Sequence, residues 1–156
     1  MSAVPELVVR RAFASDLLAL TALLLRYYAE QDIWLRDPPE KTAADLAHQQ
    51  LGFFLAEFEG TPAGCVLLRP LLSIPSATEC KRLYVAPEFR GHGVAGKLMD
   101  AAEAHVRSSG LHWIYLDSRA EMTTAIALYR RRGYEEIPRF NDNAEAVIFL
   151  RKQLVE

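Results

Sequence analysis

The chain has 156 residues, of which 51% are hydrophobic and 24% charged, and its formal net charge at pH 7 is −2. This composition fits one globular domain over residues 1–156 and excludes a disordered chain. Because the chain has no overall basic charge, and because its longest uncharged run near the start, residues 17–25, is far shorter than the roughly 20 residues of a membrane span, we expect neither nucleic acid nor a membrane as a partner.

The first third of the chain predicts one strand and two helices. Residues 7–10 are typical of a strand, and Ser15 is a good N-cap for the next helix because its hydroxyl can accept a free first-turn amide. Apolar residues then recur at helical spacing over residues 17–28. A second helix is expected within residues 38–50, beginning after the two prolines or at Thr42.

After this helix the hydrophobic period changes to that of strands. Residues 53–58 and 63–68 are short apolar runs on either side of Glu59-Gly60-Thr61-Pro62, which has the composition of a hairpin turn. Residues 78–85 alternate well enough for a fourth strand.

The last third begins with a long helical pattern from Val94 that Gly110 ends. The further expected elements are a strand at 113–116, a helix at 122–132, and strands at 134–137 and 146–150. The strand, helix and strand over residues 78–117 form a right-handed crossover unit, and hairpins surround it. The predicted fold is therefore of the α/β (α+β) class with a mixed sheet.

Two features bear on the compartment. Residues 1–11 carry Glu6 and end in Arg10-Arg11, which reverses the basic start and apolar core of a secretory signal. Cys65 and Cys80 are too few for a metal cluster or a disulfide framework. We therefore expect a cytoplasmic protein in which both cysteines are small buried hydrophobic residues.

The most informative segment joins the fourth predicted strand to the long helix and reads Arg90-Gly91-His92-Gly93-Val94-Ala95-Gly96-Lys97. Glycines let the backbone approach a ligand closely, and free first-turn amides at the positive end of a helix dipole bind anions. The pattern indicates a phosphate site.

One interpretation of this glycine loop is a dinucleotide site. Residues 91–96 match the fingerprint GxGxxG, and Asp117 ends the next strand, where a ribose-binding acid is expected. The context argues against it, because a dinucleotide fold places the loop after its first strand and continues with several parallel strands. Here a large part of the chain precedes the loop, and an antiparallel pair ends the sequence.

A second interpretation uses more residues. Residues 79–95 resemble the acetyl-CoA motif of the GNAT family of N-acetyltransferases, whose core is Arg or Gln, two residues, Gly, one residue, then Gly or Ala. Arg90, Gly93 and Ala95 occupy those positions. Residues 125–134 resemble the second family signature, a helix that ends in Leu-Tyr and is followed by Gly and an aromatic residue. The first half of the chain matches the family only in element order.

The resemblance implies a mixed, mostly antiparallel sheet of six to seven strands that is flanked by helices, with the fourth strand splayed from the fifth. The slot between these strands takes the pantetheine arm of acetyl-CoA along the fourth-strand backbone, and the glycine loop takes the pyrophosphate. The implied cofactor-binding residues are Leu83, Val85, Arg90, Gly91, His92, Gly93, Val94, Ala95, Gly96 and Lys97.

The implied chemistry is direct acetyl transfer to an amine, which needs a neutral nucleophile and a proton for the leaving thiolate. Tyr129 matches the family tyrosine that donates this proton, and Glu79 matches a glutamate that serves many members as a base, directly or through water. The chain departs from the family at Met122, where members often carry an asparagine that helps to hold the cofactor arm. Methionine cannot form that hydrogen bond.

Two neighbouring features are interpreted as structural. Arg130-Arg131-Arg132 falls in the last turn of a predicted helix, where cations complement the dipole. Cys80 is assigned to the core, because adjacent strand residues face opposite sides and Cys80 cannot share the slot with Glu79 unless a bulge intervenes.

Acceptor recognition in the family comes largely from the first two helices and the last hairpin, which here contain Tyr27-Tyr28, Asp32, Trp34, Arg36 and residues 139–143. Aromatic residues among mixed charges favour a small polar amine, such as an amino acid whose carboxylate an arginine binds. Tyr28 and Trp34 are the candidate substrate residues.

The predicted function is an acetyl-CoA-dependent N-acetyltransferase for a small-molecule amine. The alternatives are an acyl-CoA sensor without turnover and a protein-modifying acetyltransferase. No metal site is expected, and a homodimer is left open.

Overall fold

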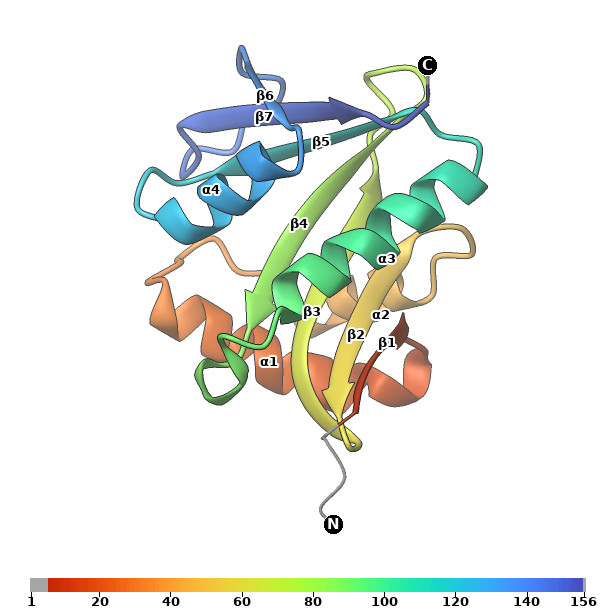
Figure 1. Ribbon diagram of the computed structural model, residues 1–156, viewed down its shortest axis with the longest axis vertical. Coiled ribbons are helices and arrows are strands. Elements are labelled where there is room, and N and C mark those ends of the chain that lie inside the picture. The colour runs from red at the N-terminus through yellow and green to blue at the C-terminus, as the bar shows by residue number, and fades with distance from the viewer. Residues whose placement is uncertain (1–5, 156) are drawn as a thin grey trace.

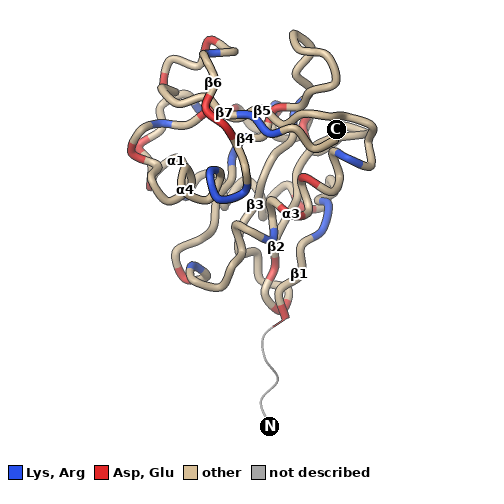
Figure 2. The backbone as a smooth tube through the Cα atoms, turned by 45° about the horizontal axis from the view of Figure 1, so that its top comes forward, with Lys and Arg blue, Asp and Glu red and all other residues tan. Residues whose placement is uncertain are grey.

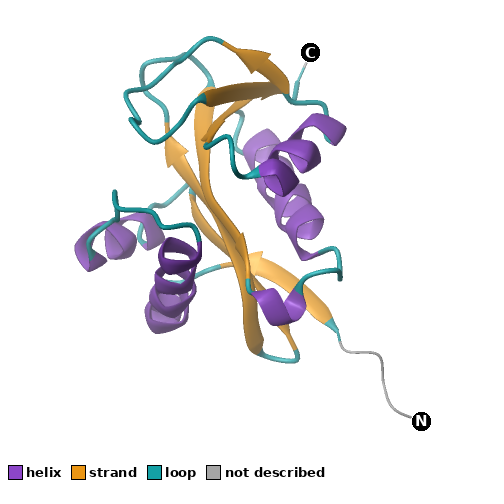
Figure 3. Ribbon diagram, turned by 90° about the vertical axis from the view of Figure 1, so that its left-hand side faces the viewer, coloured by secondary structure: helices purple, strands orange, loops and turns teal. Residues whose placement is uncertain are grey.

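Within residues 6–155, which the computed structural model describes, the predicted strands form one seven-stranded sheet with helices on both faces (Figure 1, Figure 3). The spatial order is β1-β2-β3-β4-β5-β7-β6. The strands are β1 (Leu7–Arg11), β2 (Gly52–Phe58), β3 (Thr61–Pro70), β4 (Ala77–Val85), β5 (Trp113–Ser118), β6 (Glu135–Ile137) and β7 (Ile148–Gln153). The helices are α1 (Leu17–Glu30), α2 (Pro39–Leu46), α3 (Val94–Ser108) and α4 (Thr123–Arg131), with 3-10 turns at Ala14–Asp16 and Pro87–Phe89.

The predicted order of strands and helices is confirmed, and two local predictions are wrong. Ser15 is not the N-cap of α1 but lies inside the preceding 3-10 turn, where the Asp16 carboxylate accepts a backbone amide at 2.8 Å. Helix α2 ends at Leu46 rather than near residue 50. The reason is that the ring of His48 accepts two amides of the following turn and directs the chain into β2.

The sheet separates two apolar cores. Helices α1 and α2 cover one face and α3 and α4 cover the other (Figure 3). Phe53 and Leu55 of β2 pack in the core beneath α1, whereas Phe54 and Ala56 pack in the core beneath α3. Because successive strand residues point to opposite faces and both faces are covered, β2 and β3 are buried and apolar on both faces over residues 52–56 and 63–68, whereas the neighbouring β4 carries charged residues.

Strands β4 and β5 pair over only part of their length. They run parallel and pair from Ala77 with Trp113 to Glu79 with Tyr115. Beyond Glu79, β4 continues beside β3 to Val85, while β5 continues beside β7 to Ser118. The two strands therefore diverge within the sheet, as the splayed fourth and fifth strands of the predicted fold require.

Charged residues of both signs are spread along the chain (Figure 2). Among residues 6–155, no helix has the length and apolar character needed to cross a membrane. The same part of the chain groups no three His, Cys, Asp or Glu side chains in a way that could hold a metal ion.

A buried carboxylate ties α3 to the end of α4 and to β7. Glu103 of α3 is 2% exposed. It accepts Arg132 Nε at 3.0 Å, Lys152 Nζ at 2.8 Å and the Tyr134 hydroxyl at 3.1 Å. Burial would raise the pKa of Glu103, but the hydrogen bonds and charges of Arg132 and Lys152 outweigh it and hold that pKa below its ordinary value. The carboxylate is thus ionised at neutral pH and fixes α4 on the sheet.

We expect Glu103→Gln to lower the free energy of unfolding at pH 7 by roughly 2 kcal/mol, because it removes the counter-charge of two partly buried cations. Since the folded-state pKa of Glu103 is lowered, its stabilisation is complete above the unfolded-state pKa of about 4.3 and is lost as the pH falls through the folded-state value. Urea unfolding at pH 7 and pH 3 should therefore show the deficit shrinking at the lower pH. Glu136→Gln, at an exposed ion pair, is the control, and an equal deficit in both variants would contradict the assignment.

Candidate functional site

Two cavities open where β4 and β5 diverge. The glycine-loop cavity, of about 520 Å³, lies between the end of β4, the loop that leads into α3, and the start of α4. The polar cavity, of about 480 Å³, lies between the middle of β4, the end of β5, the α1–α2 connection and the loop before β7. Both are lined by Tyr27, Leu83, Met122 and Ala125. The two cavities therefore meet at these four residues.

The loop before α3 presents a row of free backbone amides to the first cavity. Among the described residues, no acceptor is found for the amides of residues 91–96, and the N-cap Gly93 provides no side-chain cap. Gly91 and Gly93 have φ of 83° and 75°, and a Cβ on either would meet nothing within 4 Å. Glycine is thus required by the left-handed backbone rather than by crowding within the protein. The amides and the helix dipole together form an anion site.

Eight of the ten predicted cofactor residues line the glycine-loop cavity, and His92 and Lys97 do not. The ring of His92 packs edge-on against Phe58, with the centroids 5.5 Å apart, and Lys97 is exposed. Arg90 bonds the Glu30 carboxylate and donates from Nε to the Val85 carbonyl at 3.0 Å. The Arg90 guanidinium is therefore held at the edge of the cavity.

Arg131 is a cavity residue that the sequence analysis missed. Its neighbours are engaged elsewhere: Arg130 pairs with Glu136 at 3.4 Å and Arg132 binds Glu103. Arg131 has no ion-pair partner among residues 6–155, and it lines the glycine-loop cavity. Its helical spacing from Thr124 and Leu128, which line the same cavity, is the signal that could have revealed it.

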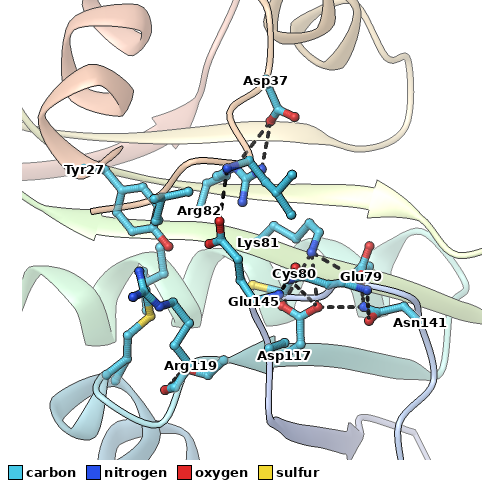
Figure 4. A pocket seen from close by; sticks show the side chains of 18 of the residues that line it. Tyr27, Asp37, Glu79, Cys80, Lys81, Arg82, Asp117, Arg119, Asn141 and Glu145 are labelled. Carbon is cyan, nitrogen blue, oxygen red and sulfur yellow. Dashed lines mark hydrogen bonds and ion pairs between the residues drawn. The ribbon is translucent and has the colours of Figure 1, made fainter. Parts of the chain in front are cut away.

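The polar cavity holds two carboxylates around one lysine. Lys81 Nζ lies 3.3 Å from Asp117 Oδ2 and 3.6 Å from Glu79 Oε2. The Asn141 side-chain amide donates to Glu79 Oε2 at 2.9 Å and to Asp117 Oδ2 at 2.6 Å, and Asn143 donates to the same Asp117 oxygen at 3.2 Å. Figure 4 shows Glu79, Lys81, Asp117 and Asn141 directed toward one another. Glu79 thus shares its position with a second carboxylate that the sequence did not assign to the site.

A bulge in β4 brings two adjacent cations into the same cavity. Arg82 has φ of 58°, and the pairing with β3 shifts register at this point. Lys81 and Arg82 therefore both line the polar cavity, although adjacent residues of a regular strand face opposite sides. Arg82 pairs with Asp37 at 3.2 Å, and the charges of Arg82 and Arg69 outweigh burial and keep the pKa of Asp37 below its ordinary value.

Tyr129 of α4 lies on the wall of the polar cavity and is 7% exposed. Burial, with further contributions from Cys80 and Asp117, raises the pKa of its hydroxyl well above the usual 10.0. Among the described residues no hydrogen-bond partner of this hydroxyl is found. The group therefore keeps its proton at neutral pH and is available as a donor.

Cys80 is part of the core, although one edge of it lines the polar cavity. Its Sγ lies 4.0 Å from Met99 Sδ, and burial raises the pKa of its thiol to about 12. A thiol that stays protonated is a poor nucleophile, so the assignment of Cys80 to packing is retained.

The two candidate substrate residues differ in position. Trp34 is 72% exposed and stands at the rim of the polar cavity. Tyr28 is 3% exposed and does not line that cavity. Its neighbour Tyr27 lines the cavity instead, because successive side chains of a helix point about 100° apart around its axis. Arg119 also lines the cavity, and its guanidinium bonds the Gln31 carbonyl.

The chain is similar to known acetyltransferases in both sequence and fold. Residues 17–134 match the model of the acetyltransferase (GNAT) family. An aminoglycoside N(6')-acetyltransferase of Stenotrophomonas maltophilia is 30% identical over 84% of this chain and 88% of its own. An IAA acetyltransferase of Azospirillum brasilense is 31% identical over 58% of this chain, which spans only 59% of that relative. An acetyltransferase structure from Salmonella typhimurium with acetyl-CoA superimposes with a TM-score of 0.77 at 19% identity, covering 96% of this chain and 95% of that one.

Proposed function

The chain belongs to the GNAT family of acetyltransferases, and from that premise we propose that it moves the acetyl group of acetyl-CoA to the amine of a small polar molecule. One observation carries this proposal: an anion-binding cavity and a carboxylate-lined cavity meet where β4 and β5 diverge, beside the buried Tyr129 hydroxyl. Acetyl-CoA is the co-substrate of the family.

The residues of the glycine-loop cavity fit this co-substrate. The free amides of residues 91–96 suit a pyrophosphate, and the edge of β4 that has no strand partner at Leu83 and Val85, where the Val85 carbonyl accepts Arg90 Nε, suits the amide-bearing pantetheine arm. Arg131 adds a cation for the phosphates. Met122 contributes only apolar contact at the junction of the two cavities, so backbone groups must hold the arm there.

Bound acetyl-CoA supplies an activated acetyl thioester. Glu79 and Asp117 hold the incoming ammonium. They accept one of its protons, so that the nitrogen lone pair is free to attack, and this proton then passes to water. Tyr129 Oη gives a proton to the leaving sulfur and regains one from the acetylated amine. Of the two protons that the ammonium loses in becoming an amide, one thus ends on water and the other replaces the proton given to sulfur.

The small polar acceptor is supported by the cavity and by the relatives. A volume of about 480 Å³, half of whose lining residues carry a charged or amide side chain, suits a polar molecule. The name of the Stenotrophomonas maltophilia relative specifies an aminoglycoside, which is a polar amine.

The role of Tyr129 can be tested directly. We expect Tyr129→Phe to lower kcat about a hundredfold, the lower range for loss of a general acid, while acetyl-CoA still raises the melting temperature of the variant. The measurement is thiol release with a panel of amines. Tyr115→Phe removes a hydroxyl that binds Arg151 outside both cavities and serves as the control. Unchanged turnover in Tyr129→Phe would remove Tyr129 as the acid, and acetyl-CoA binding without thiol release from any amine in the unaltered protein would favour the sensor.

The raised pKa of Tyr129 predicts the shape of the pH profile. A raised pKa keeps the acidic form populated to higher pH, so the donor stays protonated where the acceptor ammonium loses its proton. Turnover should therefore rise from pH 6 and show no decline from tyrosine ionisation below pH 10. A descending limb below pH 9 that disappears in Tyr129→Phe would contradict this.

Two adjacent arginines allow a matched test of the phosphate contact. We expect Arg131→Gln to raise the KM for acetyl-CoA about fivefold, equivalent to roughly 1 kcal/mol for an exposed charged contact, and this difference should shrink in high salt. Arg130→Gln changes the neighbouring side chain outside the cavity and should leave that KM within twofold. Equal effects of the two substitutions would indicate a general charge effect instead.

A further inference from the structure

The polar cavity has an excess of negative charge at one end and an excess of positive charge at the other. The acidic end consists of Glu79, Asp117 and Lys81, and the basic end consists of Arg36 and Arg82 beside Asp37. Figure 4 shows Arg82 and Asp37 well apart from the group formed by Glu79, Lys81, Asp117 and Asn141. The carboxylate pair and the arginine pair thus occupy different ends of the cavity, although each end also holds charge of the other sign.

At the basic end two guanidinium groups lie against one aromatic ring. The guanidinium carbons of Arg36 and Arg82 are 5.5 and 5.6 Å from the centroid of the Tyr28 ring. Tyr28, buried beneath the cavity, therefore positions the two cations that line it. This gives the candidate substrate residue Tyr28 an indirect role in place of a direct contact.

These guanidinium groups are incompletely neutralised. Arg82 shares a single oxygen of Asp37 with Arg69, whose Nη2 lies 2.7 Å from it. Arg36 has no carboxylate partner among residues 6–155, and its Nε donates to the Ile33 carbonyl at 2.8 Å. Two further carboxylates lie at this end: Asp45 pairs with both Arg69 and Lys41, and Glu145 accepts the backbone amides of Trp34 and Leu35. With Arg69 and Lys41 included, four cations therefore face three carboxylates at this end, and the terminal nitrogens of Arg36 are available to an anion.

The acidic end has the reverse excess. Lys81 is its single cation and faces two carboxylates, and the side chains of Lys81, Glu79 and Asp117 are only 12%, 12% and 8% exposed. Asn141 and Asn143 donate hydrogen bonds but carry no charge. An ammonium bound here would neutralise the remaining negative charge of the two carboxylates. It would lie near the Tyr129 hydroxyl, whose pKa the charge of Asp117 helps to raise.

The other charged residues of the lining are Glu145, Arg119 and Asp142. Glu145 accepts the backbone amides of Trp34 and Leu35 at 3.2 and 3.0 Å, and Arg119 is engaged with the Gln31 carbonyl and with Glu121. Asp142 is exposed at the rim.

We propose that the acceptor carries a carboxylate as well as its amine, with the carboxylate bound by Arg36 and Arg82 and the amine placed at Glu79 and Asp117. The inference rests on the proposed acetyl transfer and narrows its substrate class to amino acids and related amino carboxylates. An arginine pair suits a carboxylate because each guanidinium offers parallel donors.

The test compares each amino carboxylate with its carboxamide, which keeps the amine but lacks the carboxylate charge. Thiol release is measured with the common α-amino acids, β-alanine and γ-aminobutyrate, with the carboxamide of each, and with an aminoalkyl phosphonate, kanamycin and spermidine. We expect the best acceptor to be an amino carboxylate whose kcat/KM exceeds that of its carboxamide at least tenfold. A carboxamide as good as the acid, or a preference for the phosphonate, kanamycin or spermidine, would overturn the proposal while leaving acetyl transfer intact. Absence of thiol release with every amine would instead count against the proposed function itself.

Variants assign the discrimination to the basic end. In Arg36→Gln the ratio of kcat/KM for acid over carboxamide should fall at least tenfold, chiefly through KM for the acid. Arg82→Gln should act in the same direction, and the exposed Arg36 keeps the test valid if the buried Arg82 variant fails to fold. Arg26→Gln, which removes an exposed arginine paired with Glu88 outside both cavities, should leave the ratio unchanged. An undiminished ratio in Arg36→Gln and Arg82→Gln would show that the carboxylate binds elsewhere and would overturn the assignment.

Discussion

The functional architecture depends on the divergence of β4 from β5 beyond Glu79. Strands inside a sheet satisfy each other's backbone groups, so a separation there leaves N–H and C=O groups in need of another partner. Here β5 turns to β7 and β4 stays with β3, which leaves one edge of β4 free over residues 80–85. Both cavities lie along this edge and meet at the four lining residues that they share, which come from α1, β4 and the start of α4.

Two devices then fix the side chains around the gap. The left-handed Arg82 interrupts the alternation of β4 and directs Lys81 and Arg82 into one cavity, which a regular strand could not do. The buried Glu103 binds the residue after α4 and a residue of β7, so α4 cannot slide along the sheet without breaking a charged cluster. Such clusters add little net stability relative to apolar packing. Their effect here is positional, since α4 carries Tyr129 and Ala125 to the junction of the cavities.

The sequence was sufficient for the order of the elements and for the glycine loop, because both are local signals: hydrophobic period, turn composition, and glycines before a helix. It could not predict that Glu79 lies together with Asp117 and Asn141 at the acidic end of the polar cavity. Asn141 is 62 residues from Glu79 and 24 from Asp117, and only the docking of the last loop brings the three together. The choice between Tyr27 and Tyr28 depends on how α1 is rotated on the sheet, and the choice between the three consecutive arginines depends on where α4 sits. These are properties of tertiary packing.

The near-neutral net charge of the chain does not reveal the local charges that we propose select its acceptor. A sum of −2 excludes a strong field at long range, where salt screens charges beyond about 8–10 Å, but it places no limit on charges a few ångströms apart on a shielded cavity wall. Within the polar cavity a molecule with charges of both signs is stabilised at both ends. A polycation of similar size is attracted by Glu79 and Asp117 and repelled by Arg36 and Arg82, and such like-charge contact costs several kcal/mol. Because attraction and repulsion act on different parts of the same ligand, the proposed arrangement of charges would select both what binds and which end of it reaches Tyr129.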